Sequence, residues 1–516
     1  VTSSGKTEIY IHLISEMLAQ GKQVLYMLPE IVLTSQLTDR LRKVFGDRLG
    51  VYHSRYTDAE RVEVYRKQIS DNPYDIIVGV RSSVLLPFHN LGMVIIDEEH
   101  ETSFKQTEPA PRYHARNVAL VMARMAGAKT LLGTATPSLE SYSNAVAGKY
   151  GYVSLTTRFG NVCMPEIEVV DIAELKRKKL MNGPFSPLLL REIRQALERK
   201  EQVILFQNRR GFAPVVECHV CGWTPQCPHC DVSLTYHKRT NQLTCHYCGF
   251  STSIAQRCPQ CEADSLNSKG YGTERIEDVL ASVFPEARVA RMDLDTTRSR
   301  SAYEGIIKGF QHGDTDILIG TQMVTKGLDF RRVSVVGILN ASTMLNQPDF
   351  RSYERAYQMM TQVAGRAGRS SGTEGHNARP GRVILQVHDA KQPTVMQVVK
   401  GDYEGMFRTQ MEERRLFVYP PLCRLVYVYI KHKDESVLEH LAEEMANLLR
   451  QVFGHRVLGP DMPPVARVQT MYIRKVCLKL ELAANMAEAR RRLQEIQKYM
   501  TAKTEYKSAV MYYDVD

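Results

Sequence analysis

Short apolar runs alternate with amphipathic stretches over the first 150 residues. Runs rich in Val, Ile and Leu at 23–28, 75–80, 93–96 and 129–133 each end in polar residues, Gly or Pro. Helical periodicity fills much of the chain between them. This alternation predicts a parallel sheet with helices on both faces, where ligands bind at the carboxyl ends of the strands.

The same pattern returns further along the chain. Runs at 203–207, 317–320, 333–339 and 382–387 predict a second α/β lobe. From about residue 391 the pattern changes, with strands expected at 425–432, 471–482 and 507–514 and helices at 436–453 and 485–500. This order predicts a small α+β domain of ferredoxin-like type.

Composition narrows the class of protein. With 516 residues, 43% apolar and 24% charged, the chain is long enough for about three or four folded domains. No apolar run reaches the length of a membrane span and no signal peptide is evident, so we expect a cytoplasmic protein with no membrane partner. The net charge of +10 favours a polyanionic partner, although a mildly basic soluble enzyme has a similar charge.

The chain begins with VTSSGKT, which matches the second half of the phosphate-binding loop G-x-x-x-x-G-K-[ST]. An amphipathic helix follows, so the amides from Ser4 and Gly5 to Thr7 would point at an anion. Lys6 would neutralise phosphate charge, and the Thr7 hydroxyl would bind Mg²⁺. The first glycine of the pattern falls one residue before Val1, and we therefore expect the printed chain to hydrolyse ATP poorly.

Two further motifs supply what phosphoryl transfer requires. MVIIDEEH places Asp97 at the end of an apolar strand, where it would hold Mg²⁺, and Glu98 beside it, where it would orient or deprotonate water. QVAGRAGR, which begins at Gln362, offers Arg366 and Arg369 from the second lobe to clamp the γ-phosphate.

Eight of the eleven cysteines lie in four C-x-x-C pairs within a single block. In a reducing compartment this clustering indicates zinc rather than disulfides. The spacing favours a nested arrangement of two structural Cys₄ sites: five residues between the first two pairs are a tight fit for folding both onto one metal, whereas the fourteen between Cys230 and Cys245 can form a hairpin. The inner site would use Cys227, Cys230, Cys245 and Cys248, and the outer site Cys218, Cys221, Cys258 and Cys261.

Other residues of the block and the remaining cysteines are assigned less specific roles. His219, His229 and His246 are surplus to eight sulfurs. Trp223 with His237, Lys238 and Arg239 predicts either a contact surface for DNA or protein, or a solvated hairpin. Cys163, Cys423 and Cys477 are isolated, and we expect them to be small buried side chains.

The motifs GKT, DEEH, GTATP and QVAGRAGR occur in the order and spacing of superfamily 2 helicases, which the chain resembles. Further segments resemble one branch, the PriA family of bacterial replication-restart helicases (primosomal protein N′), over essentially the whole chain. They are LPEIVLTSQ (28–36), YHSRYTDAER (52–61), VGVRSSVLLPF (78–88), YHARN (113–117), FQNRRGFAP (206–214), the cysteine block, GYGTERIED (270–278), IGTQMVTKGLDF (319–330) and VLGP (457–460).

The resemblance implies an α/β fold with two RecA-like helicase lobes, an inserted double Cys₄ zinc module and a small α+β C-terminal domain. We expect the first lobe at 1–152, a linker at 153–187, the second lobe at 188–217 and 265–390, the zinc module at 218–264 and the last domain at 391–516. The family implies the same nested zinc pairing. It usually has Gly where Ser3 stands, so the phosphate loop is also altered.

By the same resemblance, ATP with Mg²⁺ is the nucleotide. Gln362, Gly327 and Asp329 would contact or sense it, Thr134 and Thr136 would couple hydrolysis to strand movement, and His100 would connect the acidic motif to the DNA side.

A nucleic acid strand would cross both lobes. Contacts are expected from Pro29, Glu30, Thr34, Arg81, Ser82 and Ser83 in the first lobe and from Gly320, Thr321, Gln322 and Lys326 in the second. Phe104, Lys105, Arg112, Tyr113 and Arg116 interleave aromatic and basic side chains, a composition suited to stacking on bases and pairing with phosphates. The segment resembles the aromatic-rich loop that in related helicases couples DNA engagement to hydrolysis. Pro109–Pro111 replaces the Trp common there, and core packing of Phe104 is the alternative.

These observations predict an ATP-dependent 3′→5′ DNA helicase of replication restart, acting on forked and single-stranded DNA in association with the nucleoid. Single-strand DNA-binding protein and primosome loader proteins are expected partners by resemblance. Two alternatives remain: another superfamily 2 motor such as an RNA helicase, and a zinc-dependent DNA-binding or assembly module without ATPase activity.

Overall fold

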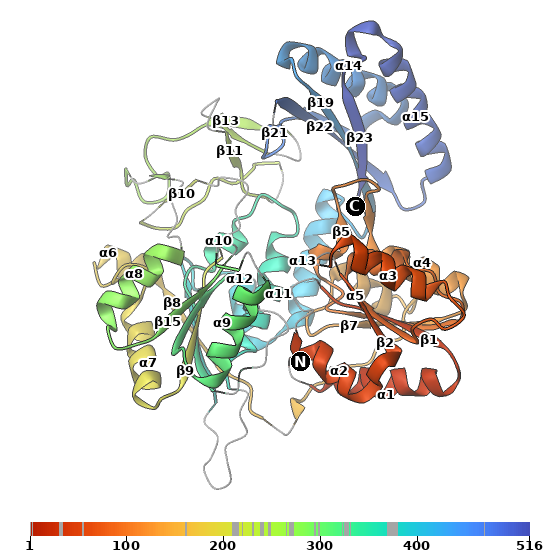
Figure 1. Ribbon diagram of the computed structural model, residues 1–516. Coiled ribbons are helices and arrows are strands. Elements are labelled where there is room, and N and C mark those ends of the chain that lie inside the picture. Colours follow the sequence, from red (N-terminus) through yellow and green to blue (C-terminus); the bar gives the residue numbers. More distant parts are fainter. Residues whose placement is uncertain are drawn as a thin grey trace.

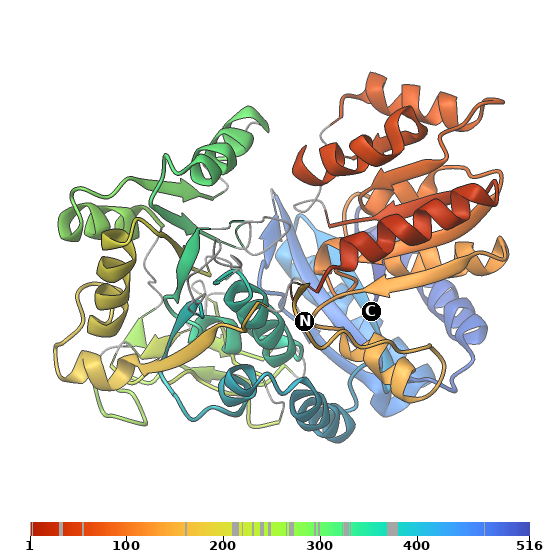
Figure 2. The same cartoon turned by 90° about the horizontal axis from the view of Figure 1, so that it is seen from below.

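The computed structural model describes most of the chain (Figures 1 and 2). The described residues are 2, 4–29, 35–53, 56–159, 162–208, 216–218, 220–229, 232–237, 242–245, 249–264, 266–267, 273–293, 296–297, 300–321, 324, 330, 332–368, 380–468 and 470–516. Within these residues, no helix combines the length and the apolarity needed to cross a membrane.

The first lobe is a five-stranded parallel sheet in the order β2-β3-β1-β4-β7. Its strands are β1 (Gln23–Met27), β2 (Leu49–Tyr52), β3 (Ile76–Gly79), β4 (Leu91–Asp97) and β7 (Lys129–Gly133). Its helices are α1 (Lys6–Ala19), α2 (Ser35–Phe45), α3 (Asp58–Gln68), α4 (Ala115–Met125) and α5 (Leu139–Val146). Side chains of α1 and α2 pack on one face of the sheet and those of α3 and α4 on the other. The predicted doubly covered parallel sheet is therefore confirmed, and β2 is an additional strand.

The second lobe is a six-stranded parallel sheet in the order β15-β16-β9-β17-β18-β8. Its strands are β8 (Glu166–Asp171), β9 (Gln202–Phe206), β15 (Val289–Met292), β16 (Ile317–Gly320), β17 (Val333–Ile338) and β18 (Arg382–Val387). Helices α7 (Pro187–Glu198) and α8 (Thr273–Val283) cover one face, whereas α9 (Arg300–His312), α10 (Ser342–Leu345) and α11 (Ser352–Ala364) cover the other. The edge strand β8 and the short helix α6 (Ile172–Arg177) lie in the segment 153–187 that was expected to be a linker.

The cysteine block forms two small antiparallel sheets. β10 (Glu217–Cys218) pairs with β14 (Leu266–Asn267), and β11 (Thr235–His237), β12 (Gln242–Thr244) and β13 (Ser251–Ser253) form the other sheet. The β11–β12 hairpin spans the gap between the two predicted inner cysteine pairs. Leu243 and Cys245 pack in one apolar cluster with Phe350 of the second lobe and Leu425 of the C-terminal domain.

Two helices connect the second lobe to the last domain. These helices, α12 (Pro393–Lys400) and α13 (Tyr403–Phe417), contribute Val395, Val398 and Met406 to the core of the second lobe. The final domain then runs β19 (Cys423–His432), α14 (Glu435–Phe453), β20 (Val457–Asp461), β22 (Met471–Glu481), α15 (Met486–Ala502) and β23 (Val510–Val515).

The sheet of the final domain has the order β20-β22-β19-β23, and its pairs are antiparallel. Both long helices pack on one face of it. This β-α-β-β-α-β order confirms the predicted ferredoxin-like topology. Figure 1 shows the domain in blue above the first lobe, with the N-terminus of the chain between the two lobes.

The isolated cysteines differ in exposure. Cys423 and Cys477 are buried as expected, whereas the expectation for Cys163 was wrong because its side chain is exposed. Cys163 lies in the irregular connector between α5 and β8, where Tyr152, Val153 and Met164 are exposed as well.

Candidate active site and metal centre

The phosphate loop runs directly into helix α1. Gly5 is the residue before the helix and has a φ of 86°, a left-handed conformation that glycine adopts without strain. The Lys6 Nζ atom lies 3.5 Å from the Glu98 Oε1 atom. The Ser4 hydroxyl is buried and has no hydrogen-bond partner within the described part of the chain. The start of α1 thus places the Lys6 cation against the acidic motif, and the unsatisfied Ser4 hydroxyl lies two residues before it in the sequence.

Asp97 ends strand β4 and is 8% exposed. Its Oδ1 atom accepts hydrogen bonds from the Tyr10 hydroxyl (3.2 Å) and from the Glu98 amide (3.1 Å). Burial and the neighbouring Glu98 charge raise the pKa of Asp97 to about 6, although Lys6 opposes the shift. A buried carboxylate in this environment fits a hard cation such as Mg²⁺.

Glu98 has a φ of 49°, a left-handed backbone that is uncommon for a residue with a side chain. Burial would raise the pKa of its carboxyl, but Lys6, His100 and Arg366 together lower the pKa below its ordinary value. Glu98 is therefore an ionised carboxylate between two sources of positive charge, one in each lobe. Arg366 follows α11 and is partly buried.

Gln362 of α11 connects the second lobe to the acidic motif. Its Nε2 atom lies 3.0 Å from Glu98 Oε2 and 2.9 Å from His100 Nε2, so the two amide hydrogens are donated to both groups. His100 Nδ1 then donates to the Thr134 hydroxyl at 2.8 Å, and the Thr136 amide donates to the same oxygen at 3.0 Å. The structure brings Glu98, His100 and Thr134 into one chain of hydrogen bonds that begins in the opposite lobe.

Glu99 lies between Glu98 and His100 in the sequence, and its carboxylate has a structural role. Its carboxylate accepts from Arg116 Nη1 at 2.6 Å, from the Ser138 amide at 2.7 Å and from the Ser141 hydroxyl at 2.8 Å. Arg116 is 9% exposed. The prediction of Arg116 as a DNA contact is therefore wrong, because the buried Glu99 carboxylate holds its guanidinium in the protein interior.

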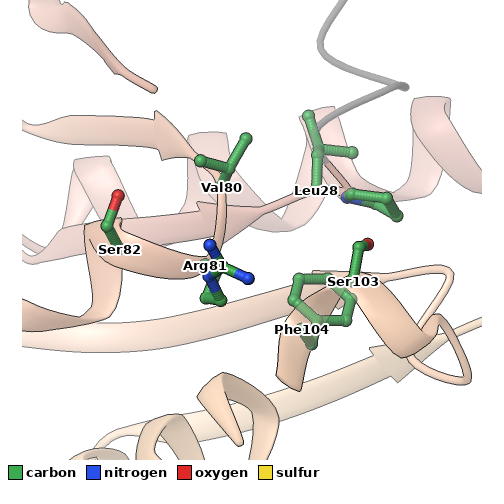
Figure 3. A pocket seen from close by; sticks show the side chains of 7 residues that line it. Leu28, Val80, Arg81, Ser82, Ser103 and Phe104 are labelled. Carbon is green, nitrogen blue, oxygen red and sulfur yellow. The ribbon is translucent and has the colours of Figure 1, made fainter. Parts of the chain in front are cut away.

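Three predicted DNA-contact segments of the first lobe surround one small pocket (Figure 3). Its lining is Leu28, Pro29, Val80, Arg81, Ser82, Ser103 and Phe104. Phe104 is fully buried in the core of the first lobe, which bears out the core-packing alternative for that residue. Ser83 is also fully buried and its hydroxyl donates to the Val80 carbonyl at 2.6 Å, so Ser83 was wrongly placed on the DNA path.

The aromatic and basic segment after the acidic motif contacts the final domain. It includes β5 (Lys105–Gln106) and β6 (Tyr113–His114). Lys105 Nζ lies 2.6 Å from an Asp514 carboxylate oxygen, and the Arg112 guanidinium lies 3.7 Å from the centre of the Tyr512 ring. Strand β23 therefore contacts two residues predicted to bind DNA.

A second junction between the lobes was not predicted. Glu354 of α11 accepts from the Leu139 amide of the first lobe at 2.9 Å and from Arg414 of α13 at 2.5 Å. Glu140 forms ion pairs with Arg351 (2.9 Å) and Arg414 (3.5 Å). These charges join the first turn of α5, the N-terminal part of α11 with Arg351 before it, and helix α13.

The outer cysteine set forms one cluster. Its members are Cys218, Cys221, Cys258 and Cys261, whose sulfur atoms all lie within 4.8 Å of one another. Four thiolates at this spacing fit tetrahedral zinc. In the predicted inner set, Cys227 and Cys245 are buried in one apolar cluster, and Cys230 and Cys248 lie outside the described residues. Trp223 is partly buried, and its carbonyl accepts from the Cys218 amide at 2.8 Å.

Several predicted site residues lie outside the described residues, and their assignments remain predictions. They are Ser3, Glu30, Thr34, His219, Lys238, Arg239, His246, Gln322, Lys326, Gly327, Asp329 and Arg369. Two contributors to the site were missed, Tyr10 and Glu354. They carry no local motif, because their partners lie 87 and 60 residues away along the chain.

A phosphate loop and an acidic motif in one lobe, faced by helix α11 and the arginine that follows it in the second lobe, are the arrangement expected of superfamily 2 helicases. Family models agree: DEAD/DEAH box helicase matches residues 1–145, the PriA DNA helicase Cys-rich region matches 227–252, and the helicase conserved C-terminal domain matches 271–371. The chain belongs to the replication restart protein PriA family.

Comparison with curated relatives supports this assignment. Replication restart protein PriA of Bacillus subtilis is 41% identical over 96% of this chain and 60% of its own length. The proteins of the same name from Haemophilus influenzae and Rickettsia felis are 39% and 36% identical, over 67% and 73% of their lengths. The chain thus spans about three fifths of the Bacillus relative. A solved structure of RecG bound to a three-way DNA junction aligns with 80% of this chain and 42% of its own, at 15% identity and a TM-score of 0.44.

Proposed function

We propose that this chain is the motor part of a DNA-stimulated ATPase that moves 3′→5′ along single-stranded DNA and unwinds forked DNA during replication restart. The observation that carries the proposal is the double hydrogen bond from Gln362 to Glu98 and His100. It joins the candidate catalytic carboxylate of one lobe to helix α11 of the other, which Arg366 follows. A site divided in this way converts nucleotide turnover into relative movement of the lobes.

In the proposed reaction the phosphate loop and Lys6 hold the β- and γ-phosphates. Asp97 and Thr7 would hold Mg²⁺, which supplies charge neutralisation and orients the phosphates when bound. Glu98 orients the attacking water and accepts its proton. Because the pKa of Glu98 is lowered, it is a weak base, and its main contribution is to orient the water. Arg366, with Arg369, stabilises the negative charge that develops on the transferred group.

Nucleotide binding would also break an existing contact. Lys6 is paired with Glu98 at 3.5 Å, and it must turn toward the phosphates to bind them. Glu98 would then interact with Gln362, His100 and the attacking water. Since His100 donates to Thr134, a displacement of Glu98 is transmitted to the GTATP loop.

The zinc module and the partners complete the proposal. We assign two structural Zn²⁺ ions in the nested arrangement, and the outer set has the sulfur cluster that such a site requires. Forked and single-stranded DNA are the proposed substrates. Single-strand DNA-binding protein and primosome loader proteins are proposed partners, and association with the nucleoid would follow from DNA binding.

ATPase and strand-displacement assays test this function. They compare the chain as printed with a chain extended upstream to complete the phosphate loop, each with and without single-stranded DNA. We expect DNA-stimulated hydrolysis by the extended chain, its loss in Lys6→Ala and Glu98→Gln, and normal hydrolysis in the exposed control Lys178→Ala. Duplexes with a 3′ or a 5′ tail then give the direction of movement.

The same assays separate the alternatives. Unwinding confined to RNA duplexes would contradict a DNA motor and support an RNA helicase. Zinc-dependent DNA binding with no hydrolysis by the extended chain would support an assembly module instead. If Lys6→Ala left hydrolysis intact in the extended chain, the assignment of the phosphate site would be wrong.

A further inference from the structure

Arg158 is a buried side chain in an otherwise open connector. The connector joins α5 of the first lobe to β8 of the second, and exposed residues surround Arg158, with Val153 86% and Phe159 78% exposed. Arg158 itself is only 4% exposed. A long charged side chain is rarely buried to this degree without specific partners.

The partners are backbone carbonyls of the loop that carries Arg366. Arg158 Nη2 donates to the Gly365 carbonyl at 3.3 Å, and Nη1 donates to those of Ala367 at 3.3 Å and Gly368 at 3.0 Å. Nη1 also donates to the Cys163 carbonyl of the connector at 3.2 Å. The guanidinium therefore donates hydrogen bonds to carbonyls on both sides of Arg366 in the sequence.

Helix geometry explains why a guanidinium belongs here. Helix α11 ends at Ala364, and the carbonyls of Gly365, Ala367 and Gly368 lie past its end, where donors must come from outside the helix. A cation at this end also complements the helix dipole. The far side of the loop is already fixed, because the Gly368 amide donates to the Val333 carbonyl at 3.0 Å. The hydrogen bonds from Arg158 fix the other side of this loop.

The same connector reaches the other half of the nucleotide site. The Phe159 ring, next to Arg158, lies 3.8 Å from the position a Cβ atom would take on Gly5 of the phosphate loop. Of these two consecutive residues, Arg158 binds the loop of Arg366 and Phe159 lies beside the loop that begins α1.

We propose that Arg158 is a positioning residue for Arg366: it fixes the backbone from which Arg366 reaches the γ-phosphate, and it ties the connector between the lobes to that group. The proposal rests on the proposed function, since it assigns Arg366 a role in ATP hydrolysis. It predicts that loss of Arg158 impairs recognition of the transition state more than binding of the ground state.

The test uses Arg158→Gln and Arg158→Lys in the extended chain, with Arg177→Gln as the exposed control. A fluorescent ADP is titrated with and without aluminium fluoride. We expect Arg158→Gln to leave ADP affinity within about twofold and to lose about tenfold of the affinity gained with aluminium fluoride, with a matching fall in kcat at unchanged KM. Arg158→Lys, which keeps a donor, should recover part of the loss.

A double variant separates positioning from a general structural role. If Arg158 acts through Arg366, then Arg158→Gln combined with Arg366→Ala is no worse than Arg366→Ala alone. Independent, multiplying losses would overturn the proposal. So would an equal loss of affinity with and without aluminium fluoride, which indicates a damaged fold.

Hydrogen exchange of the nucleotide-free protein gives a second readout that needs no hydrolysis. The amides of residues 365–368 should exchange at least about tenfold faster in Arg158→Gln than in the wild type or the control. Unchanged protection would overturn the proposal. If the wild type showed no hydrolysis and no gain with aluminium fluoride, the proposed function would fail, whereas the exchange result would still decide whether Arg158 holds the loop.

Discussion

The side-chain amide nitrogen of Gln362, Nε2, lies 3.0 Å from Glu98 Oε2, although the two residues are 264 positions apart along the chain. The same nitrogen lies 2.9 Å from His100. A neutral amide in this place orients the carboxylate without neutralising it, so Glu98 keeps its charge while its direction is set by the second lobe. The orientation of the candidate catalytic group is thus sensitive to the distance between the lobes.

Gln362→Ala should lower kcat of the extended chain with little change in ADP affinity. A hydrogen bond to a charged group contributes about 1.5–3 kcal/mol, which corresponds to about 10–150-fold in rate if it is lost in the transition state. Steady-state ATPase assays with single-stranded DNA measure the effect, and Gln494→Ala, an exposed glutamine on α15, is the control. An unchanged kcat would show that Glu98 is oriented without Gln362.

Arg414→Ala should destabilise the protein strongly. Arg414 is 1% and Glu354 3% exposed in their side chains, and removal of one partner leaves the other charge buried and unpaired. Such a loss costs about 3–5 kcal/mol. Chemical unfolding measures it, with Arg415→Ala, an exposed neighbour, as the control. A loss below about 1 kcal/mol would contradict the importance of this junction.

Glu140 gives the same junction a pH dependence. Burial opposes its ionisation, but Arg351, Arg414 and Arg116 outweigh burial and lower the pKa of Glu140. A carboxyl with a lowered folded-state pKa stabilises the protein above its ordinary pKa, near 4.5, and this stabilisation is lost as the pH falls below that value.

Glu140→Gln should therefore be less stable than the wild type at pH 7, and the difference should shrink below about pH 4.5 by at most about 1.4 kcal/mol per pH unit. Unfolding curves from pH 7 to pH 3.5 measure this trend, with Glu443→Gln, on the exposed face of α14, as the control. A difference that stays constant down to pH 3.5 would rule out the lowered pKa.

The sequence predicted most strands of the two parallel sheets because buried strands are continuous apolar runs followed by polar residues. β4 is such a run, and Asp97 at its end was correctly expected to lie beside the phosphate loop. β2, β8 and β15 were missed, and all three lie at the edges of their sheets. β8 and β15 are partly exposed and carry charged residues, and Gly50 interrupts the short apolar run of β2, so none of them is a continuous apolar run.

The contacts that organise the site were less predictable. In the sequence, Tyr10 resembles an ordinary core residue of an amphipathic helix. Only the tertiary structure shows that its hydroxyl donates a hydrogen bond to Asp97. Arg158 stands in a stretch without periodicity, yet its side chain enters the second lobe. Arg116 shows the converse: its basic, aromatic surroundings indicated DNA, whereas the structure pairs it with Glu99. Local pattern reports residue type and burial but not the partner of a polar side chain.

Paired cysteine variants test the nested zinc arrangement. Cys258→Ser should lower the zinc content from two ions per chain to one, because one ligand of the outer cluster is lost. Cys218→Ser/Cys258→Ser should still retain one zinc, whereas Cys218→Ser/Cys245→Ser should retain none. Elemental analysis gives the counts, and Cys163→Ser is the exposed control. Retention of one zinc by the last double variant would contradict the nesting.

Asp514→Asn should strengthen binding to single-stranded DNA. Asp514 holds Lys105 at 2.6 Å, and strand β23 keeps Arg112 against Tyr512, so both cations face the final domain instead of a phosphate backbone. Removal of the Asp514 charge frees Lys105 for one further phosphate contact. We expect tighter binding at low salt and a salt-dependence slope steeper by about one.

Fluorescence anisotropy with a labelled oligonucleotide over a range of salt concentrations measures the affinity and the slope. Glu443→Gln makes the same charge change at an exposed site on α14 and controls for net charge. Lys105→Ala should abolish the gain in the double variant, because the added contact requires its ammonium group. Equal gains in Asp514→Asn and Glu443→Gln would mean that only net charge matters and that β23 does not mask Lys105.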